Sequence, residues 1–217
     1  LQLVVYTIVF SFILKTNIER YYLYLFVALI PWIFFSSSIT VGSASIVAQK
    51  DLIKKIYFPR MVIPISYVTS SFVNMLLCFI VIFAVIIVSG AGINFLALLT
   101  LPVIMLVEYI LALGMAMLTS AITVYFRDLE HILGIVTMAW MYMTPIMYDK
   151  SIVPENLMPI FNLNPMTHVI ECYRAVLYEK KIPDLTTLLS AAGLGILILI
   201  VGILVFNKLQ KRFAEEL

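Results

Sequence analysis

The sequence of 217 residues contains little charge and little cysteine. Charged residues make up 12% of the chain, about half of their share in an ordinary soluble domain. Hydrophobic residues make up 63%. This composition excludes a conventional soluble enzyme and predicts an integral membrane protein with little mass outside the bilayer. The net charge is only +2 and the basic residues are scattered, so nucleic acid is not an expected partner.

The scarcity of cysteine also excludes some site chemistry. Cys78 lies inside a long apolar run and Cys172 in a polar connector, so we expect neither a disulfide nor a metal site. The chain also lacks a Gly-x-x-x-x-Gly-Lys-Ser/Thr loop, which cradles nucleotide phosphates. We therefore expect no cofactor on this chain, and we expect a partner to bind any ATP and Mg²⁺.

Long uncharged runs indicate where the chain crosses the membrane. Residues 21–49 and 61–107 carry no charge, and about 20 apolar residues are enough to cross a bilayer. As one helix, the second run would be roughly 70 Å long, about twice a bilayer. It must therefore turn, and the Ser-Gly-Ala-Gly-Ile-Asn segment at 89–94 is a suitable turn.

The expected fold is all-α, a single polytopic membrane domain over residues 1–217 with six spans. They are predicted at about 1–14, 21–48, 62–88, 95–124, 132–148 and 185–207. The first has only 14 apolar residues before Lys15 and lacks the marks of a signal peptide. We expect it to be the outer part of a helix whose beginning is missing. Six spans place both termini on one side.

The distribution of Lys and Arg predicts which side is cytosolic. Eight residues lie beside span ends on one side: Lys50, Lys54, Lys55, Arg60, Arg127, Lys208, Lys211 and Arg212. Six are spread over longer loops on the other side: Lys15, Arg20, Lys150, Arg174, Lys180 and Lys181. We therefore expect the first side, with both termini, to be cytosolic.

Five sequence blocks lie in order at the predicted helix boundaries. They are Leu52-Ile53-Lys54-Lys55-Ile56-Tyr57-Phe58-Pro59-Arg60, Tyr125-Phe126-Arg127-Asp128-Leu129, Thr144-Pro145-Ile146-Met147-Tyr148, Asn164-Pro165-Met166 with Tyr173-Arg174, and Phe213-Ala214-Glu215-Glu216-Leu217. Together they resemble the permease subunit of type-2 ABC exporters. The resemblance is strongest to the polysaccharide branch, which exports O-antigen, capsule or teichoic acid, and it covers essentially the whole chain.

The resemblance implies a bacterial plasma-membrane permease that forms a homodimer, binds two separate ABC ATPase subunits and does not hydrolyse ATP itself. It implies that a lipid-diphosphate-linked glycan moves outward through the dimer, which is surrounded by membrane lipids. A drug- or lipid-exporting permease of the same superfamily is the alternative. An intramembrane enzyme using Glu108, His131 or His168 is disfavoured, because the predicted topology places the two histidines on opposite sides.

The connector at residues 50–60 resembles the family's cytosolic coupling helix, which sits in a groove of the ATPase. Tyr57 and Phe58 would be apolar anchors surrounded by basic side chains. Alternatively, the basic residues only fix the topology. A second predicted hairpin contains Arg127 and Asp128, which either dock on the ATPase or form a salt-bridged turn. The predicted coupling residues are Lys54, Lys55, Tyr57, Phe58, Arg60, Arg127 and Asp128.

Residues 149–184 are too few for a folded domain, yet they are patterned. One helical face carries Met166, Val169, Ile170, Tyr173, Val176 and Leu177. Asn164-Pro165 should start this helix, Glu171 and Arg174 should point elsewhere, and the apolar face should bury against the outer mouth of the dimer. In the family, this region forms two short re-entrant gate helices. The alternative is an interfacial helix without a gating role. The predicted gate residues are Pro145, Asn164, Pro165, Ile170, Tyr173 and Arg174.

Polar and aromatic residues inside the spans are candidates for a substrate path. Glu108 lies near the middle of the fourth span, where it would contact a polar substrate, couple to protons, or be a neutral or paired structural acid near Asn74. The hydroxyls of the second span suit close helix packing or a glycan path. The aromatic rings suit membrane anchoring or sugar stacking. The candidate path residues are Trp32, Phe35, Ser37, Glu108, Trp140 and Tyr142.

Overall fold

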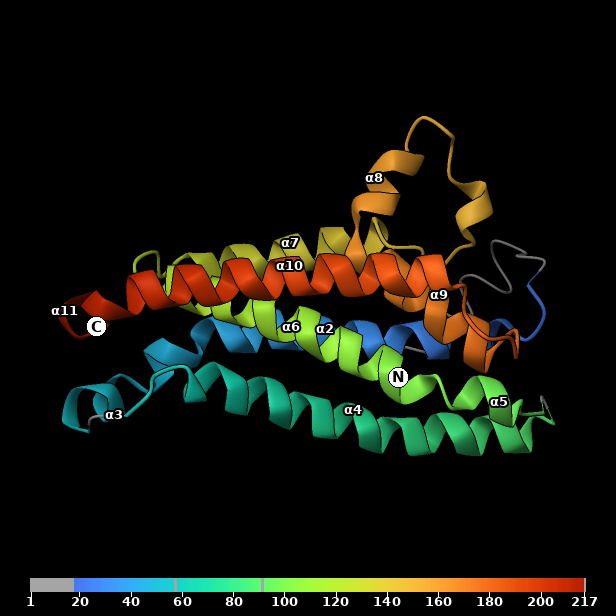
Figure 1. The fold of residues 1–217 in the computed structure, drawn as a ribbon, viewed down its shortest axis with the longest axis horizontal. Helices are drawn as coiled ribbons and strands as arrows, with labels where there is room; N and C mark the ends of the chain where they lie inside the picture. Colours follow the sequence, from blue (N-terminus) through green and yellow to red (C-terminus); the bar gives the residue numbers. More distant parts are fainter. Residues whose placement is uncertain (1–17, 57, 91, 217) are drawn as a thin grey trace.

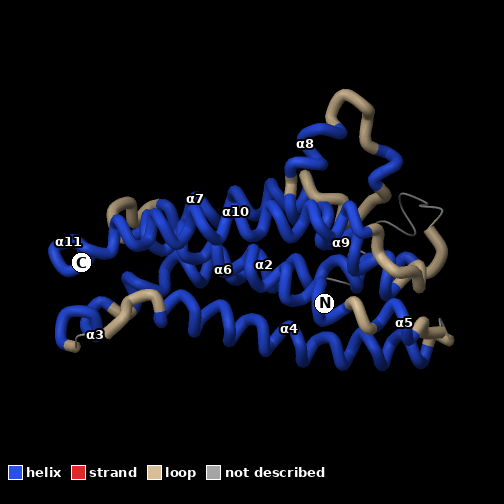
Figure 2. Tube along the Cα trace, in the orientation of Figure 1, coloured by secondary structure: helices blue, strands red, loops and turns tan. Residues whose placement is uncertain are grey.

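The computed structural model describes residues 18–56, 58–90 and 92–216. This part of the chain forms an elongated helical bundle without strands (Figures 1 and 2). Its long, apolar helices lie along the bundle axis, as expected when every backbone polar group must be satisfied within the bilayer. Four of them are long enough to cross a membrane: α2 (Tyr21–Ala48), α4 (Val62–Val88), α5 with α6 (Phe95–Leu98 and Leu101–Thr123), and α10 (Leu185–Leu209) with the short η3 (Gln210–Arg212).

The break in the long uncharged run is confirmed. Helix α4 ends at Val88, and Gly90 and Gly92 follow with φ angles of 62° and 77°. These left-handed conformations favour glycine, because it has no Cβ. The Asn94 side chain then accepts a 3.0 Å hydrogen bond from the backbone N–H of Leu96 and caps α5.

Helix α6 lies at the centre of the bundle and contacts α2, α4, α7, α9 and α10. Glycines allow two of these contacts to be very close. A Cβ added to Gly114 would lie 2.6 Å from the backbone of Leu199 on α10, and one added to Gly202 would collide with the carbonyl oxygen of Gly114. A Cβ on Gly42 of α2 would lie 2.8 Å from the Ala116 Cβ. Small residues thus bring the helices together.

Helix α7 (Leu129–Tyr142) is shorter than the predicted span at 132–148. It has 14 residues, or about 21 Å of helix, and it ends before Pro145. Proline disfavours a helical conformation at the residue before it and cannot donate a helical hydrogen bond. The chain continues through η2 (Lys150–Ile152), α8 (Met158–Leu163) and α9 (Pro165–Leu177). The predicted span at 1–14 lies outside the described residues.

The connectors gather at the two ends of the bundle, as Figure 1 shows. One end holds α3 (Lys50–Lys55), the turn between α6 and α7, and α11 (Phe213–Glu216). The opposite end holds α5 and α9. The eight basic residues grouped together by the sequence analysis therefore lie at the same end of the molecule.

Candidate functional site

Helix α3, which lies in the predicted coupling connector, directly follows α2. Ile53 is buried beneath it, whereas Lys54 and Lys55 are exposed in its last turn, where positive charge complements the helix dipole. Leu52 and Ile56 are apolar, yet 40% and 56% exposed. Sequence reasoning did not single out these two residues, and Ile56 is the extended residue that directly follows α3.

The structure describes only one of the two aromatic residues that were predicted to be anchors. Tyr57 lies outside the described residues, so its role stays a prediction. Phe58 is half-buried and packs against a cluster of the subunit's own core that includes Ile53 and Ile63. Among the described residues of this connector, the exposed apolar surface therefore comes mainly from Leu52 and Ile56.

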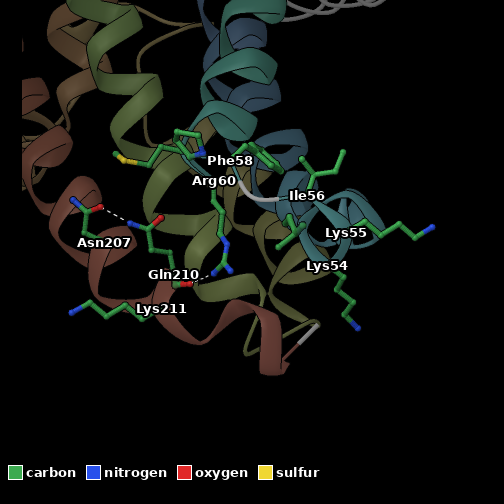
Figure 3. Close-up of a pocket in the computed structure, with 11 residues that line it drawn as sticks. Lys54, Lys55, Ile56, Phe58, Arg60, Asn207, Gln210 and Lys211 are labelled. Carbon is green, nitrogen blue, oxygen red and sulfur yellow. Dashed lines mark hydrogen bonds between the residues drawn. The ribbon is translucent and has the colours of Figure 1, made fainter.

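Arg60 joins this connector to the C-terminal segment. Its guanidinium donates a hydrogen bond to the carbonyl oxygen of Gln210 and lies 6.0 Å from the centre of the Phe213 ring. Figure 3 shows the groove of about 780 Å³ between the two segments. The groove is lined by Ile53, Lys54, Lys55, Ile56, Phe58, Pro59, Arg60, Met61, Asn207, Gln210 and Lys211.

The turn between α6 and α7 forms the neighbouring part of the same end. Arg127 and Asp128 are both exposed, and no ion pair joins them within the described ranges, so the expected salt-bridged turn is absent there. Phe126 is 69% exposed. Tyr125 instead points inward, and its hydroxyl donates a 3.0 Å hydrogen bond to the carbonyl oxygen of Leu209.

At the opposite end, the apolar face predicted for α9 is confirmed by burial of all six residues that define it. The expected burial against a second copy is wrong, because these residues are already covered within one subunit. Helix α9 packs on α2, α6 and α10. The Tyr173 ring lies 5.6 Å from the Phe79 ring, centre to centre, and Ile170 is fully buried.

Glu108 and Tyr173 form a buried pair between α6 and α9. The Tyr173 hydroxyl donates a 2.7 Å hydrogen bond to Glu108 Oε2, and both side chains are fully buried. The partner is therefore Tyr173 and not Asn74, which lies on an exposed face of α4. A paired acid in the subunit core fits a structural role better than a substrate contact.

Arg174 does not point away from the core as expected. It is 6% exposed, its Nη2 donates a 2.7 Å hydrogen bond to the Ile146 carbonyl oxygen, and its guanidinium lies 3.6 Å from the centre of the Tyr24 ring. A planar guanidinium stacks on an aromatic ring while it remains charged. The helical pattern treated this residue only as polar, and the sequence does not reveal its tertiary partner.

Asn164 starts α9, as predicted, and also fastens it to the end of α7. Its Oδ1 accepts hydrogen bonds from the Met166 backbone N–H at 3.1 Å and from Trp140 Nε1 at 3.0 Å. Its Nδ2 donates to Thr144 Oγ1 at 2.9 Å. Pro145 is buried beside this junction, and Pro165 occupies the first turn of α9.

The loop before α8 carries charged residues near α9. Asp149 Oδ1 accepts a 2.8 Å hydrogen bond from the Ser151 backbone N–H. Hydrogen bonds from the side chain and backbone of Ser151 hold the pKa of Asp149 below its usual value, because they stabilise the carboxylate. Lys150 forms a 2.8 Å ion pair with Glu171, which links the loop to α9.

The candidate path residues do not converge on one site. The Phe35 ring lies 5.7 Å from Trp32 and 5.3 Å from Trp140, centre to centre. Trp32 and Phe35 are buried within the subunit. Ser37 lines a separate cavity of about 180 Å³ between α2 and α4, together with Asn74. Tyr142 is exposed at the end of α7.

The groups named for an intramembrane enzyme are also separated. His131 is exposed in the first turn of α7, whereas His168 belongs to α9 at the opposite end of the bundle (Figure 1). The His168 Nε2 lies 2.8 Å from the Asn162 carbonyl oxygen, and Glu108 is paired with Tyr173. These three groups do not form a shared site.

Comparison with known proteins identifies the family. A family model described as ABC-2 type transporter matches residues 1–178. This chain belongs to the ABC-2 type transporter family. Among its relatives is an O-antigen export system permease protein RfbA from Myxococcus xanthus, 30% identical over 100% of this chain and 84% of the relative. Two permeases of the same name from Klebsiella pneumoniae are 33% and 31% identical, each over 98% of this chain and 82% of the relative.

Membership of the ABC-2 family agrees with the architecture. Four apolar helices of sufficient length make the chain a multi-pass membrane protein. The match to the family model includes α3, the turn between α6 and α7, and α9. It ends before α10, so the C-terminal contacts of Arg60 and Tyr125 come from the structure alone.

Proposed function

We propose that this chain is the membrane permease of an ABC exporter that moves O-antigen out across a bacterial plasma membrane. The observation that carries the proposal is its similarity, over nearly its whole length, to permeases named for O-antigen export. The substrate would be a lipid-diphosphate-linked glycan. Two copies of the chain would form the path, and two separate ATPase subunits would bind ATP and Mg²⁺.

The ATPase subunits would dock at the end that holds α3 and the turn between α6 and α7. Leu52, Ile56 and Phe126 are exposed apolar side chains suited to be anchors in a partner's pockets. Lys54, Lys55 and Arg127 lie exposed around them and supply the charged rim that is common at such interfaces. Tyr57 would add a further anchor, and Asp128 a polar contact.

The same proposal gives the chain six spans with both termini in the cytosol. Residues 1–14 would contribute the first span, and α7 with the turn through Tyr148 would form the fifth. Helices α8 and α9 would be the outer gate. Opening would shift α9 against α2 and α6, with Asn164 at one end of the moving segment and Arg174 at the other.

Deletion of the gene for this chain in its native host tests the proposal. We expect O-antigen to disappear from the cell surface. Its lipid-linked form should accumulate inside the cell, because the assembled glycan cannot be exported without the permease. Re-expression of the chain should restore surface O-antigen only when the ATPase is catalytically active. Surface O-antigen that is unchanged in the deletion strain would overturn the proposal, and altered drug resistance or lipid distribution would favour the alternative permease.

A further inference from the structure

The C-terminal segment Leu209–Phe213 lies between the two connectors that meet at the α3 end of the bundle. Phe213 is fully buried, and its ring lies 5.5 Å from Phe206 and 6.4 Å from Tyr125, centre to centre. The segment borders a groove on each side. Gln210 and Lys211 line the groove beside α3. The second groove, of about 790 Å³, lies beside the turn between α6 and α7 and is lined in part by Glu216, just beyond the segment.

Hydrogen bonds attach both connectors to this segment. The Arg60 guanidinium donates to the carbonyl oxygen of Gln210, and the Tyr125 hydroxyl donates to that of Leu209. Gln210 begins the 3₁₀ turn η3 that continues α10, and its carbonyl oxygen also accepts a hydrogen bond from the backbone N–H of Phe213. A cation is further favoured there by the helix dipole. Arg60 and Tyr125 therefore meet consecutive carbonyls at the end of α10.

Helix α3 depends on the same cluster for its own position. It has six residues, and Ile53 is the buried one among them. A helix this short is not stable in isolation, so tertiary contacts must hold it. Ile53 belongs to a buried cluster with Ile63, Val124, Phe206 and Phe213. Removal of the Phe213 ring would leave a space within the cluster that supports α3.

We propose that the segment Leu209–Phe213 is a brace that sets the position of α3 relative to α10 and the turn between α6 and α7. Arg60, Tyr125 and Phe213 are its positioning residues. A displacement of α10 is then transmitted to α3 by the Arg60 contact, and to the turn between α6 and α7 by the Tyr125 contact. The functional importance of the brace rests on the proposed docking of the ATPase at α3, whereas its mechanical role does not.

A nitroxide spin label at Lys55→Cys, in a Cys78→Ser background, reports the mobility of α3 in the full chain reconstituted in nanodiscs. Phe213→Ala and Arg60→Gln should both shift the spectrum to faster motion. Phe213→Leu and Arg60→Lys should restore most of the immobile component, because they keep the apolar volume and the charge. Arg212→Ala is the matched control, since Arg212 is exposed and adjacent to Phe213.

The same variants, assembled with the ATPase subunits, show whether the brace matters for export. With Phe213→Ala and Arg60→Gln, we expect ATP-driven export to fall about tenfold, equivalent to about 1.4 kcal/mol, while the Arg212→Ala control stays near wild type. Arg60→Gln leaves the aromatic cluster in place, so its result stands even if Phe213→Ala fails to fold.

Two outcomes test the brace and the proposed docking site independently of each other. Unchanged mobility of the label in both Phe213→Ala and Arg60→Gln would overturn the brace. Increased mobility with normal ATPase binding and normal export would keep the brace, and would overturn the assignment of α3 as the docking element.

Discussion

Glu108 and Tyr173 place a carboxyl and a phenol in direct contact inside the bundle, and both side chains are fully buried. The bond joins the central helix α6 to α9. The other carboxyl oxygen, Oε1, has no hydrogen-bond partner among the described residues. The pair is therefore sensitive to any change that removes its single hydrogen bond.

Tyr173→Phe should destabilise the permease by about 1–3 kcal/mol, because the substitution leaves the buried Glu108 without a donor. Glu108→Gln should cost less, since an amide oxygen still accepts the bond from Tyr173. Thermal unfolding of the purified protein in detergent measures both. Tyr109→Phe is a matched control on α6, the helix of Glu108, because the lost bond to Thr69 is exposed. Equal melting temperatures for Tyr173→Phe and Tyr109→Phe would contradict the prediction.

The residues of α9 show which structural features the sequence predicts and which it does not. The apolar face, including Ile170 and Tyr173, follows from helical spacing alone. The partners of that face do not, because spacing identifies which side is buried but not what covers it. Arg174 was placed wrongly for a related reason. Its burial depends on Tyr24 and Ile146, which lie far away in the sequence.

The exposed apolar side chains of Leu52 and Ile56, in and directly after α3, predict a measurable effect on ATPase binding. The double substitution Leu52→Ala with Ile56→Ala should weaken binding of the ATPase at least about thirtyfold, because even one central apolar anchor is worth about 2 kcal/mol or more. Membrane insertion should be unaffected. Co-purification at varied ATPase concentration measures the change.

Leu163→Ala is the control for that experiment, because Leu163 is an exposed apolar residue of α8, remote from α3 along the chain. ATPase binding that falls equally in Leu163→Ala would indicate a general loss of folding. Unchanged binding in the Leu52 and Ile56 variant would remove α3 from the interface.

The bounds of the long helices were accessible from sequence, whereas the end of α7 was not. Helix α2 occupies the predicted residues 21–48, and α4 the predicted region up to Val88, since charge and glycine mark these limits. The fifth helix was expected to continue to residue 148. Hydrogen bonds from Asn164 and Trp140 instead organise the chain after Tyr142, and such long-range contacts leave no local periodic signal.

The crossing of α6 and α10 has no room for another methyl group. Gly202→Ala should therefore destabilise the bundle by about 1–3 kcal/mol, the usual cost of overpacking. Gly193→Ala in the same helix meets no atom within 4 Å, so it should be neutral or stabilising by about 0.5–1 kcal/mol through higher helix propensity. Unfolding in detergent compares the two. A Gly202→Ala variant as stable as Gly193→Ala would refute the close crossing.

Each end of the molecule carries lysines that can be replaced by cysteine to test which side of the membrane that end faces. Lys55 and Lys211 lie at the α3 end, whereas Lys180 follows α9 at the other. In a Cys78→Ser, Cys172→Ala background, a membrane-impermeant thiol reagent should label Lys180→Cys in intact cells. Lys55→Cys and Lys211→Cys should react only after permeabilisation, because loops rich in Lys and Arg stay in the cytosol.

Labelling of the parent without added cysteines sets the background of that assay. If Lys55→Cys reacts in intact cells and Lys180→Cys does not, the orientation is inverted. If both react, the two ends are not on opposite sides of the membrane.

The near-contact of Gly114 with Gly202 restricts how α6 and α10 move relative to each other. Sliding by one turn along the axis would bring Ile198 or Phe206 to the place now occupied by a hydrogen atom of Gly202, and the Gly114 carbonyl would block either side chain. The two helices also approach closely two turns away, where a Cβ added to Gly195 would lie 3.5 Å from the Leu111 Cβ. Any transport cycle that moves α6 and α10 would therefore keep their register.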